Sequence, residues 1–395
     1  MLEQPLYSLT HSISARRNCT RTLTVRVLTV LLAMMIVSSV HAGAARLIEV
    51  TSEAGICSGK VVSMDSRLCC LQDRFGVIRR IPVSGLKSVR VLAENFVPAA
   101  ASEFREKLRS EFGSDYDIAG STHYLVCAPR GRANSYCDLF ERSFRQIEHF
   151  YRVRGFEVQE PDSPLVAIIF ATQDEFREYC RRDNSDWSKE LLGYYSLNTN
   201  RVTLFDELSP ALASTHRNVS VSPGIRSMFS IAGPTADTII HETTHQVGYN
   251  IGVHSRIGGS PSWILEGLAT VLEADGMRMA GSRSGNASRI NESRLSWFRS
   301  QYSSRQQAGD LARMVADEKF FNGNVLDAYS NAWAVTWFLT ENPARARAFA
   351  SYLRLVESRD PLKDYSANQR LHDFREAFGD PAKVEVEMLR AMDRL

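Results

Sequence analysis

The chain has 395 residues, enough for two or three domains of ordinary size. Its composition, 44% hydrophobic and 23% charged, is that of a globular protein and excludes a disordered chain. A formal net charge of +2 is too small to indicate a nucleic-acid or acidic-membrane partner by bulk electrostatics, so function must come from a local site.

An arginine-rich segment followed by an uncharged one opens the chain. The uncharged stretch covers residues 27–45, and its apolar core, residues 27–40, has the length of a signal-peptide core rather than of a membrane span. Small residues follow and favour cleavage after Ala42 or Ala44. We therefore interpret residues 1–44 as a signal peptide, the alternative being an uncleaved membrane anchor. The rest of the chain is then exported, and is periplasmic or associated with the cell envelope.

Cysteine use is compatible with export. Cys19 would leave with the signal peptide, and an even number remains, which permits disulfides. Buried free thiols are the alternative for some of them. No C-x-x-C pair occurs, which argues against a zinc site built from cysteines. The remaining six are Cys57, Cys69, Cys70, Cys127, Cys137 and Cys180.

Residues 45–97 predict a small all-β domain. Short β-rich runs alternate there with glycines and other turn residues, a spacing typical of a small SH3-like barrel. A charged helical stretch, Ala101–Phe112, follows, and we interpret residues 98–115 as a helical linker. The predicted strands are Lys60–Met64, Leu68–Leu71, Val77–Ile81 and Ser88–Leu92.

Residues 116–290 predict an α+β domain, in which strands and helices alternate around a mixed sheet. Apolar side chains recur with a helical period in Tyr136–Tyr151, and Gln173–Arg182 is a second helix candidate. The strand candidates are His123–Ala128, Pro164–Ala171 and Arg201–Phe205.

Helical signals dominate from Thr235 onwards. Thr235 can cap a helix, and Ser260-Pro261 supplies a capping hydroxyl followed by proline at the first helical position, so a second helix is predicted over Trp263–Glu273. A polar loop, Gly281–Glu292, follows. We expect residues 291–395 to form a helical C-terminal part, with helices over Leu326–Thr340, Ala344–Val356 and Val384–Leu395.

The sequence His241-Glu242-Thr243-Thr244-His245 is an H-E-x-x-H motif. Residues four apart lie on one face of a helix, so both imidazoles can reach one metal ion. Glu242 projects beside them and can take a proton from water that the metal activates. Because this short pattern also arises by chance, the surrounding sequence must indicate whether the motif is a metal site.

A third ligand is available on the second predicted helix. Glu266 follows His245 by 21 residues, enough for a turn and a return helix, and Gly267 would allow that helix a close approach to its neighbour. Catalytic zinc takes three protein ligands and leaves one position to water, and two histidines with one glutamate meet that number. We expect one zinc ion, although other divalent ions suit such ligands.

Two other interpretations of these residues fit the pattern less well. A metzincin site needs a third histidine where this chain has Ile251, so that pattern fails. His254 is available, but its spacing matches no zinc pattern. The alternative for Glu266 is an ordinary glutamate on a helix surface.

The motif followed by Trp263-Ile264-Leu265-Glu266-Gly267-Leu268-Ala269 resembles the gluzincin metallopeptidases, which include thermolysin and the aminopeptidase branch. More closely, it resembles a gluzincin-like bacterial family of unknown function numbered 1570, in which a Y-x-x-x-W-A segment lies downstream, here Tyr329–Ala334. The resemblance covers roughly residues 116–395 and implies a zincin-like catalytic domain. The G-A-M-E-N-type signature of true aminopeptidases is absent, which argues against exopeptidase activity.

The resemblance also implies supporting residues. Tyr329 lies at a separation similar to that of the tyrosine in aminopeptidase-type relatives and would donate to a transition-state oxyanion; the alternative is a core aromatic. Thr270 and Glu273 are candidates to orient a metal-bound imidazole, although Glu273 equally suits a solvated position. Arg201–Phe205 resembles the edge strand of zincin clefts, which could pair with an extended substrate.

Two functions of different classes follow from these residues. The first is an exported zinc metallopeptidase acting on a peptide or protein, with Glu242 and Tyr329 as catalytic residues and His241, His245 and Glu266 as metal ligands. The second is a non-enzymatic cell-envelope binding protein on a zincin-like scaffold, for which a fourth protein ligand on the metal would be evidence. The paired E-G-x-A helix argues against a chance motif. Neither function involves nucleic acid, and membrane contact is expected only if residues 27–40 stay as an anchor.

Overall fold

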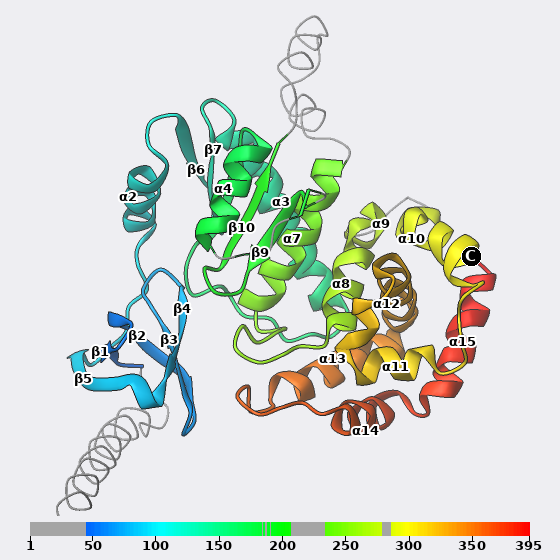
Figure 1. Ribbon diagram of the computed structural model, residues 1–395. Helices are drawn as coiled ribbons and strands as arrows, with labels where there is room; N and C mark the ends of the chain where they lie inside the picture. The colour runs from blue at the N-terminus through cyan, green and yellow to red at the C-terminus, as the bar shows by residue number, and fades with distance from the viewer. Residues whose placement is uncertain (1–44, 184, 186–187, 190, 207–233, 279–285) are drawn as a thin grey trace, which may run out of the picture. The chain divides into compact units, whose positions relative to one another are not determined.

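The computed structural model describes residues 45–183, 185, 188–189, 191–206, 234–278 and 286–395 (Figure 1). The predicted signal peptide or anchor, residues 1–44, lies outside the described residues, and so do residues 281–285 of the predicted polar loop. Among the helices that are described, none has the length and apolar character needed to cross a membrane. The chain divides into two compact units, Met1–Pro98 and Ala99–Leu395.

The first unit is an antiparallel sheet of five strands in the order β4-β3-β2-β1-β5. Alternate side chains of β1 are buried, so that Ile48 and Val50 form a core with Leu71 of β3. Each predicted strand of this region overlaps an observed one, and β1 was not predicted. The strands are β1 Leu47–Ser52, β2 Gly55–Met64, β3 Leu68–Gln72, β4 Ile78–Pro82 and β5 Leu86–Ala93.

The six cysteines after Cys19 are free thiols, and all but Cys57 are buried. No disulfide forms among them, so the alternative of buried thiols holds. Burial raises the pKa of Cys69 and Cys127 to about 12, which keeps both thiols protonated and unreactive at neutral pH.

The second unit contains a mixed sheet in the order β6-β7-β8-β10-β9. The three central strands are parallel, and the two edge strands are antiparallel to their neighbours. The strands are β6 Tyr116–Gly120, β7 Tyr124–Pro129, β8 Leu165–Phe170, β9 Gly193–Ser196 and β10 Arg201–Phe205.

The prediction that Arg201–Phe205 is an edge strand is wrong. This segment is β10, which lies between β8 and β9, and the edge is formed by β9. The chain turns back after β9 through Asn200, whose φ of 60° is left-handed, and β9 then pairs antiparallel on the outer side of β10. A strand of four residues gives too weak a sequence pattern to reveal this.

Helices cover both faces of the sheet. On one face, α3 (Ala133–Val153) and α7 (Pro234–Asn250) pack against the strands and share one hydrophobic core with them (Figure 1). On the other face, Phe170 of β8 packs against Tyr179 of α4 (Gln173–Asp183), with ring centroids 5.3 Å apart. Because both faces are covered, all six residues of β8 are buried, as its uninterrupted apolar run indicates.

Residues 98–115, predicted as a helical linker, do contain a helix, but that helix packs within the second unit. They contain α2 (Ala101–Phe112), which packs against β6 and buries Phe104 and Leu108. Glu111 of α2 also forms an ion pair with Arg201, at 2.9 Å. The helix is therefore part of the second unit.

The C-terminal residues are helical, as expected, but they do not form a separate unit. One hydrophobic core runs from the sheet through α8 to the last helix, because α8 packs against both α7 and α12. The helices are α8 Ser262–Glu273, α9 Asp275–Arg278, α10 Glu292–Trp297, α11 Asp310–Ala316, α12 Val325–Thr340, α13 Pro343–Glu357, α14 Ala367–Phe378 and α15 Pro381–Asp393.

Both predicted helix caps are wrong. Helix α7 begins at Pro234, which places Thr235 inside the helix. Helix α8 begins at Ser262, after Pro261 and without a side-chain cap from Ser260. Its first N–H is instead accepted by the carboxylate of Glu318, at 3.1 Å, from a segment 56 residues away. A tertiary contact thus replaces the local cap.

Candidate metal centre

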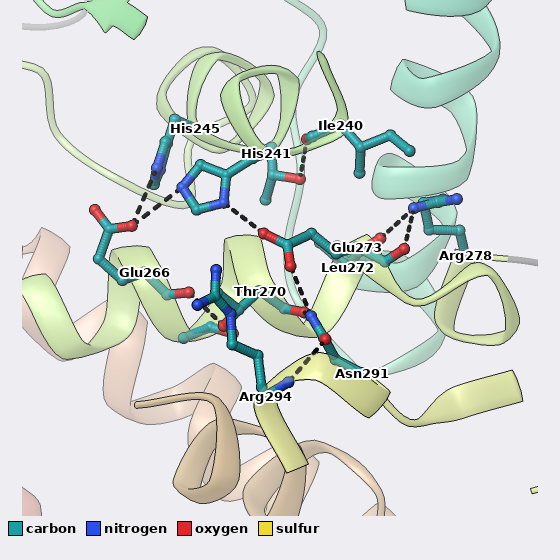
Figure 2. A network of polar contacts seen from close by, with 12 residues as sticks. Ile240, His241, His245, Glu266, Thr270, Leu272, Glu273, Arg278, Asn291 and Arg294 are labelled. Carbon is teal, nitrogen blue, oxygen red and sulfur yellow. Dashed lines mark hydrogen bonds and ion pairs between the residues drawn. The ribbon is translucent and has the colours of Figure 1, made fainter. Parts of the chain in front are cut away.

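Three side chains that the motif placed on two predicted helices converge in the structure. Three potential ligand atoms lie within 4.8 Å of one another, one each from His241, His245 and Glu266. The Oε2 atom of Glu266 is 3.1 Å from Nε2 of His241 and 3.7 Å from Nε2 of His245 (Figure 2). Two imidazole nitrogens and one carboxylate oxygen therefore face a common point.

The buried side-chain amide of Gln246 fixes the orientation of helix α7 about its own axis on the sheet. The Nε2 atom of Gln246 donates to the carbonyl oxygens of Asn200 and Val166, at 2.8 and 3.1 Å. Ile239 and Val247 are fully buried on the same side of the helix. The opposite, partly buried side then carries His241 and His245 towards α8.

Helix α8 reaches its position because of a glycine. A Cβ atom on Gly267 would lie 2.7 Å from the carbonyl oxygen of Ala332 on α12, and would also collide with Thr336. This confirms the close approach predicted for Gly267. Glu266, its neighbour in sequence, is thereby fixed opposite α7.

A second carboxylate orients one of the imidazoles. The Nδ1 atom of His241 lies 2.8 Å from Oε1 of Glu273, and the other oxygen of Glu273 accepts from Nδ2 of Asn291 at 2.6 Å. Of the two candidates for this role, Glu273 fills it. Thr270 does not, because its hydroxyl donates to the backbone oxygen of Glu266 at 2.6 Å.

The three candidate ligands depend on one another electrostatically. Burial by itself would raise the pKa of Glu266, but the charges and hydrogen bonds of His245 and His241 hold it well below its usual range. Burial would likewise lower the pKa of His241, yet its hydrogen bonds to Glu266 and Glu273 raise it well above 6.5. The surroundings of Glu266 therefore favour a charged carboxylate next to a positive charge. A bound metal cation would supply such a charge.

Tyr329 and Glu242 lie beside the cluster. The ring of Tyr329, on α12, stacks on His241 with centroids 6.2 Å apart and planes at 11°. Burial, followed by the charge of Glu266, raises the pKa of Tyr329, so its hydroxyl remains a donor. Within the described residues no side chain hydrogen-bonds the Glu242 carboxylate, which is only partly buried.

His254 is separate from the cluster. It is buried, its ring centroid lies 5.4 Å from that of Tyr249, and burial together with the charge of His245 lowers its pKa to about 3. The edge strand β9 does run along α7, since Tyr195 stacks on Tyr249 at 5.5 Å and Gly193 packs closely against Thr238.

Sequence reasoning missed three residues that support the site: Gln246, Asn291 and Arg278. Asn291 caps α10, and a cap of that kind is visible in the sequence as asparagine followed by glutamate. Its contact with Glu273 is not visible there. Arg278 donates to the last carbonyl groups of α8, at Leu272 and Glu273.

One comparison with known proteins matches the part of the chain that carries His241, His245 and Glu266. No curated protein sequence matches the chain. A family model does match, over residues 235–363, which include all of α7 but its first residue, together with α8 and the Tyr329 segment. The residues that build the candidate metal centre thus match the family described as "Protein of unknown function (DUF1570)".

Proposed function

We propose that the chain is an exported zinc metallopeptidase of the gluzincin type. The arrangement of α7, α8 and a mixed sheet with an antiparallel edge strand supports a zincin-like catalytic domain. The five antiparallel strands of the first unit support an SH3-like barrel. Export, to the periplasm or cell envelope, rests on the pattern of residues 1–44.

The observation that carries the proposal is the hydrogen bond from His241 to Glu273. A proton on Nδ1 of His241, shared with Glu273, leaves the lone pair of Nε2 for a metal beside His245 and Glu266. The donor set of two nitrogens and one oxygen suits zinc. The cluster found among the described residues has three members, which leaves a position for water, whereas structural zinc sites are closed by four.

Each remaining residue has a role that its surroundings support. Zinc, when bound, would lower the pKa of water and polarise the substrate carbonyl. Glu242, with no competing hydrogen bond among the described side chains, would take the proton of the attacking water and return it to the leaving amine. Tyr329, protonated and stacked on His241, would donate to the developing oxyanion.

Metal content and turnover together test the proposal. Elemental mass spectrometry of the protein lacking residues 1–44 should give about one zinc per chain, lost in H241A and E266A. E242Q should keep zinc and lose peptide hydrolysis. A folded wild type that takes up no zinc, or an active E242Q variant, would refute the mechanism. A fourth side chain on the metal would favour a binding protein instead.

A further inference from the structure

Arg294 is a cation beside the candidate metal centre that has no carboxylate partner in the part of the chain that the structure describes. It lies on α10, its side chain is partly buried, and its Nε atom is buried without a hydrogen-bond partner. Across the described residues no ion pair involves its guanidinium. Nearby arginines of the same unit differ, since Arg289 pairs with Glu341 and Arg305 with Asp327, each at 2.6 Å.

The guanidinium of Arg294 faces the catalytic side of the cluster. Its central carbon lies 5.4 Å from the centroid of the Tyr329 ring, and its charge acts on the Tyr329 hydroxyl. Figure 2 shows the side chain rising from α10 towards α8, on the side where Glu266 and His241 lie. A group bound by Arg294 would therefore adjoin the site of reaction.

The backbone of Arg294 is held by the network of residues that orients His241. Asn291 accepts the backbone N–H of Arg294 at 3.2 Å and donates to Glu273 and to the carbonyl of Thr270, at 2.6 and 2.9 Å. The first turn of α10 is thus tied to α8. A guanidinium that rises from a fixed backbone, and whose donors have no side-chain partner among the described residues, is prepared for an anion.

We infer that Arg294 binds a carboxylate of the substrate next to the reacting bond. The planar guanidinium can donate two parallel hydrogen bonds to a carboxylate, and a contact with an aromatic ring only partly compensates its charge. The inference rests on the proposed function and gives its substrate class: peptides with a carboxylate beside the scissile bond. That carboxylate belongs either to the C-terminus or to an aspartate or glutamate side chain.

Binding of two small probes tests the inference without turnover. Succinic monohydroxamate carries a carboxylate, and its amide analogue is neutral; both can chelate the metal through the hydroxamate. Calorimetry on the zinc-loaded wild type should show about 10- to 100-fold tighter binding of the carboxylate probe, because hydrogen bonds to charged groups have that strength. R294Q should lose this preference and keep its affinity for the neutral probe, which also shows that it is folded. R375Q, which changes an exposed arginine on α14, should behave as wild type.

Equal binding of the two probes to the wild type, or an undiminished preference in R294Q, would overturn the inference and leave Arg294 as a charge that balances the acidic site. Peptide pairs then distinguish the sources of the carboxylate: free against amidated C-termini, and aspartate against asparagine within the chain. R294Q should raise KM for the preferred peptide more than it lowers kcat. Failure of the proposed function has a different signature, since it would appear as absent zinc, or as probe binding with no peptide hydrolysed.

Discussion

The Nδ1 atom of His241 is hydrogen-bonded to Glu273, 2.8 Å away, and Glu273 lies two turns after Glu266 on the same helix. One helix therefore supplies both a candidate ligand and the carboxylate that orients a second ligand on another helix. In the proposed zinc site, this pairing would place the proton of His241 on Nδ1 and would make metal affinity depend on the packing of α7 against α8.

Removal of the Glu273 carboxylate should weaken metal binding. We expect E273A to lower zinc affinity about 10- to 100-fold, and E273Q, which keeps an acceptor oxygen, to lower it less. Competition with a chromophoric chelator measures the affinity. E376Q, which changes an exposed glutamate on α14, is the control. Unaltered affinity in E273A would show that the hydrogen bond does not orient the ligand.

Loss of the Tyr329 hydroxyl should affect turnover and spare the metal. We expect Y329F to bind zinc as the wild type does and to lower kcat about 100-fold, because one oxyanion donor contributes that much. Y151F is a matched control, since the Tyr151 hydroxyl is buried and has no hydrogen-bond partner among the described residues. Equal turnover in Y329F and wild type would make Tyr329 a core aromatic.

A methyl group at Gly267 should destabilise the second unit. Its Cβ would lie 2.7 Å from the backbone oxygen of Ala332, which cannot move without separating α8 from α12. Overpacking of this kind costs about 1–3 kcal/mol, more than the roughly 1 kcal/mol that alanine gains over glycine in a helix. Urea unfolding of G267A measures the difference. G259A, where the added Cβ meets nothing within 4 Å, should be neutral, and equal midpoints for both variants would contradict the steric argument.

Acid should destabilise the second unit partly through Glu141. Burial would raise the pKa of this carboxyl, but hydrogen bonds from Ser121, His123 and Arg145 lower it from 4.5 to about 2. Because the folded pKa lies below the unfolded one, the stabilisation is complete above about pH 4.5 and is lost as the pH falls towards 2.

The E141Q variant tests this dependence. The stability of the wild type, from urea midpoints, should fall more steeply between pH 5 and 3 than that of E141Q. E106Q, which changes an exposed glutamate on α2, should keep the slope of the wild type. Parallel pH profiles for E141Q and wild type would show that the Glu141 network does not stabilise the fold in its charged form.

Long periodic segments were predictable from the sequence, and short or capped ones were not. The helix expected over Ala101–Phe112 has those bounds in the structure, because its pattern is local. The cap of α8 was predicted wrongly because Glu318, distant in sequence, satisfies the first N–H. The edge strand β9 was missed because four residues carry too little pattern to outweigh the longer neighbour β10.

The sequence by itself determined that His241, Glu242 and His245 share one turn of a helix, since residues four apart lie on the same face whatever surrounds them. Only the tertiary structure decided which partners that face would meet. Gly267 allowed α8 to approach α12, and Asn291 tied α10 to Glu273. These contacts join residues between 18 (Glu273 and Asn291) and 69 (Gly267 and Thr336) positions apart in the sequence, and their geometry depends on packing that no local pattern encodes.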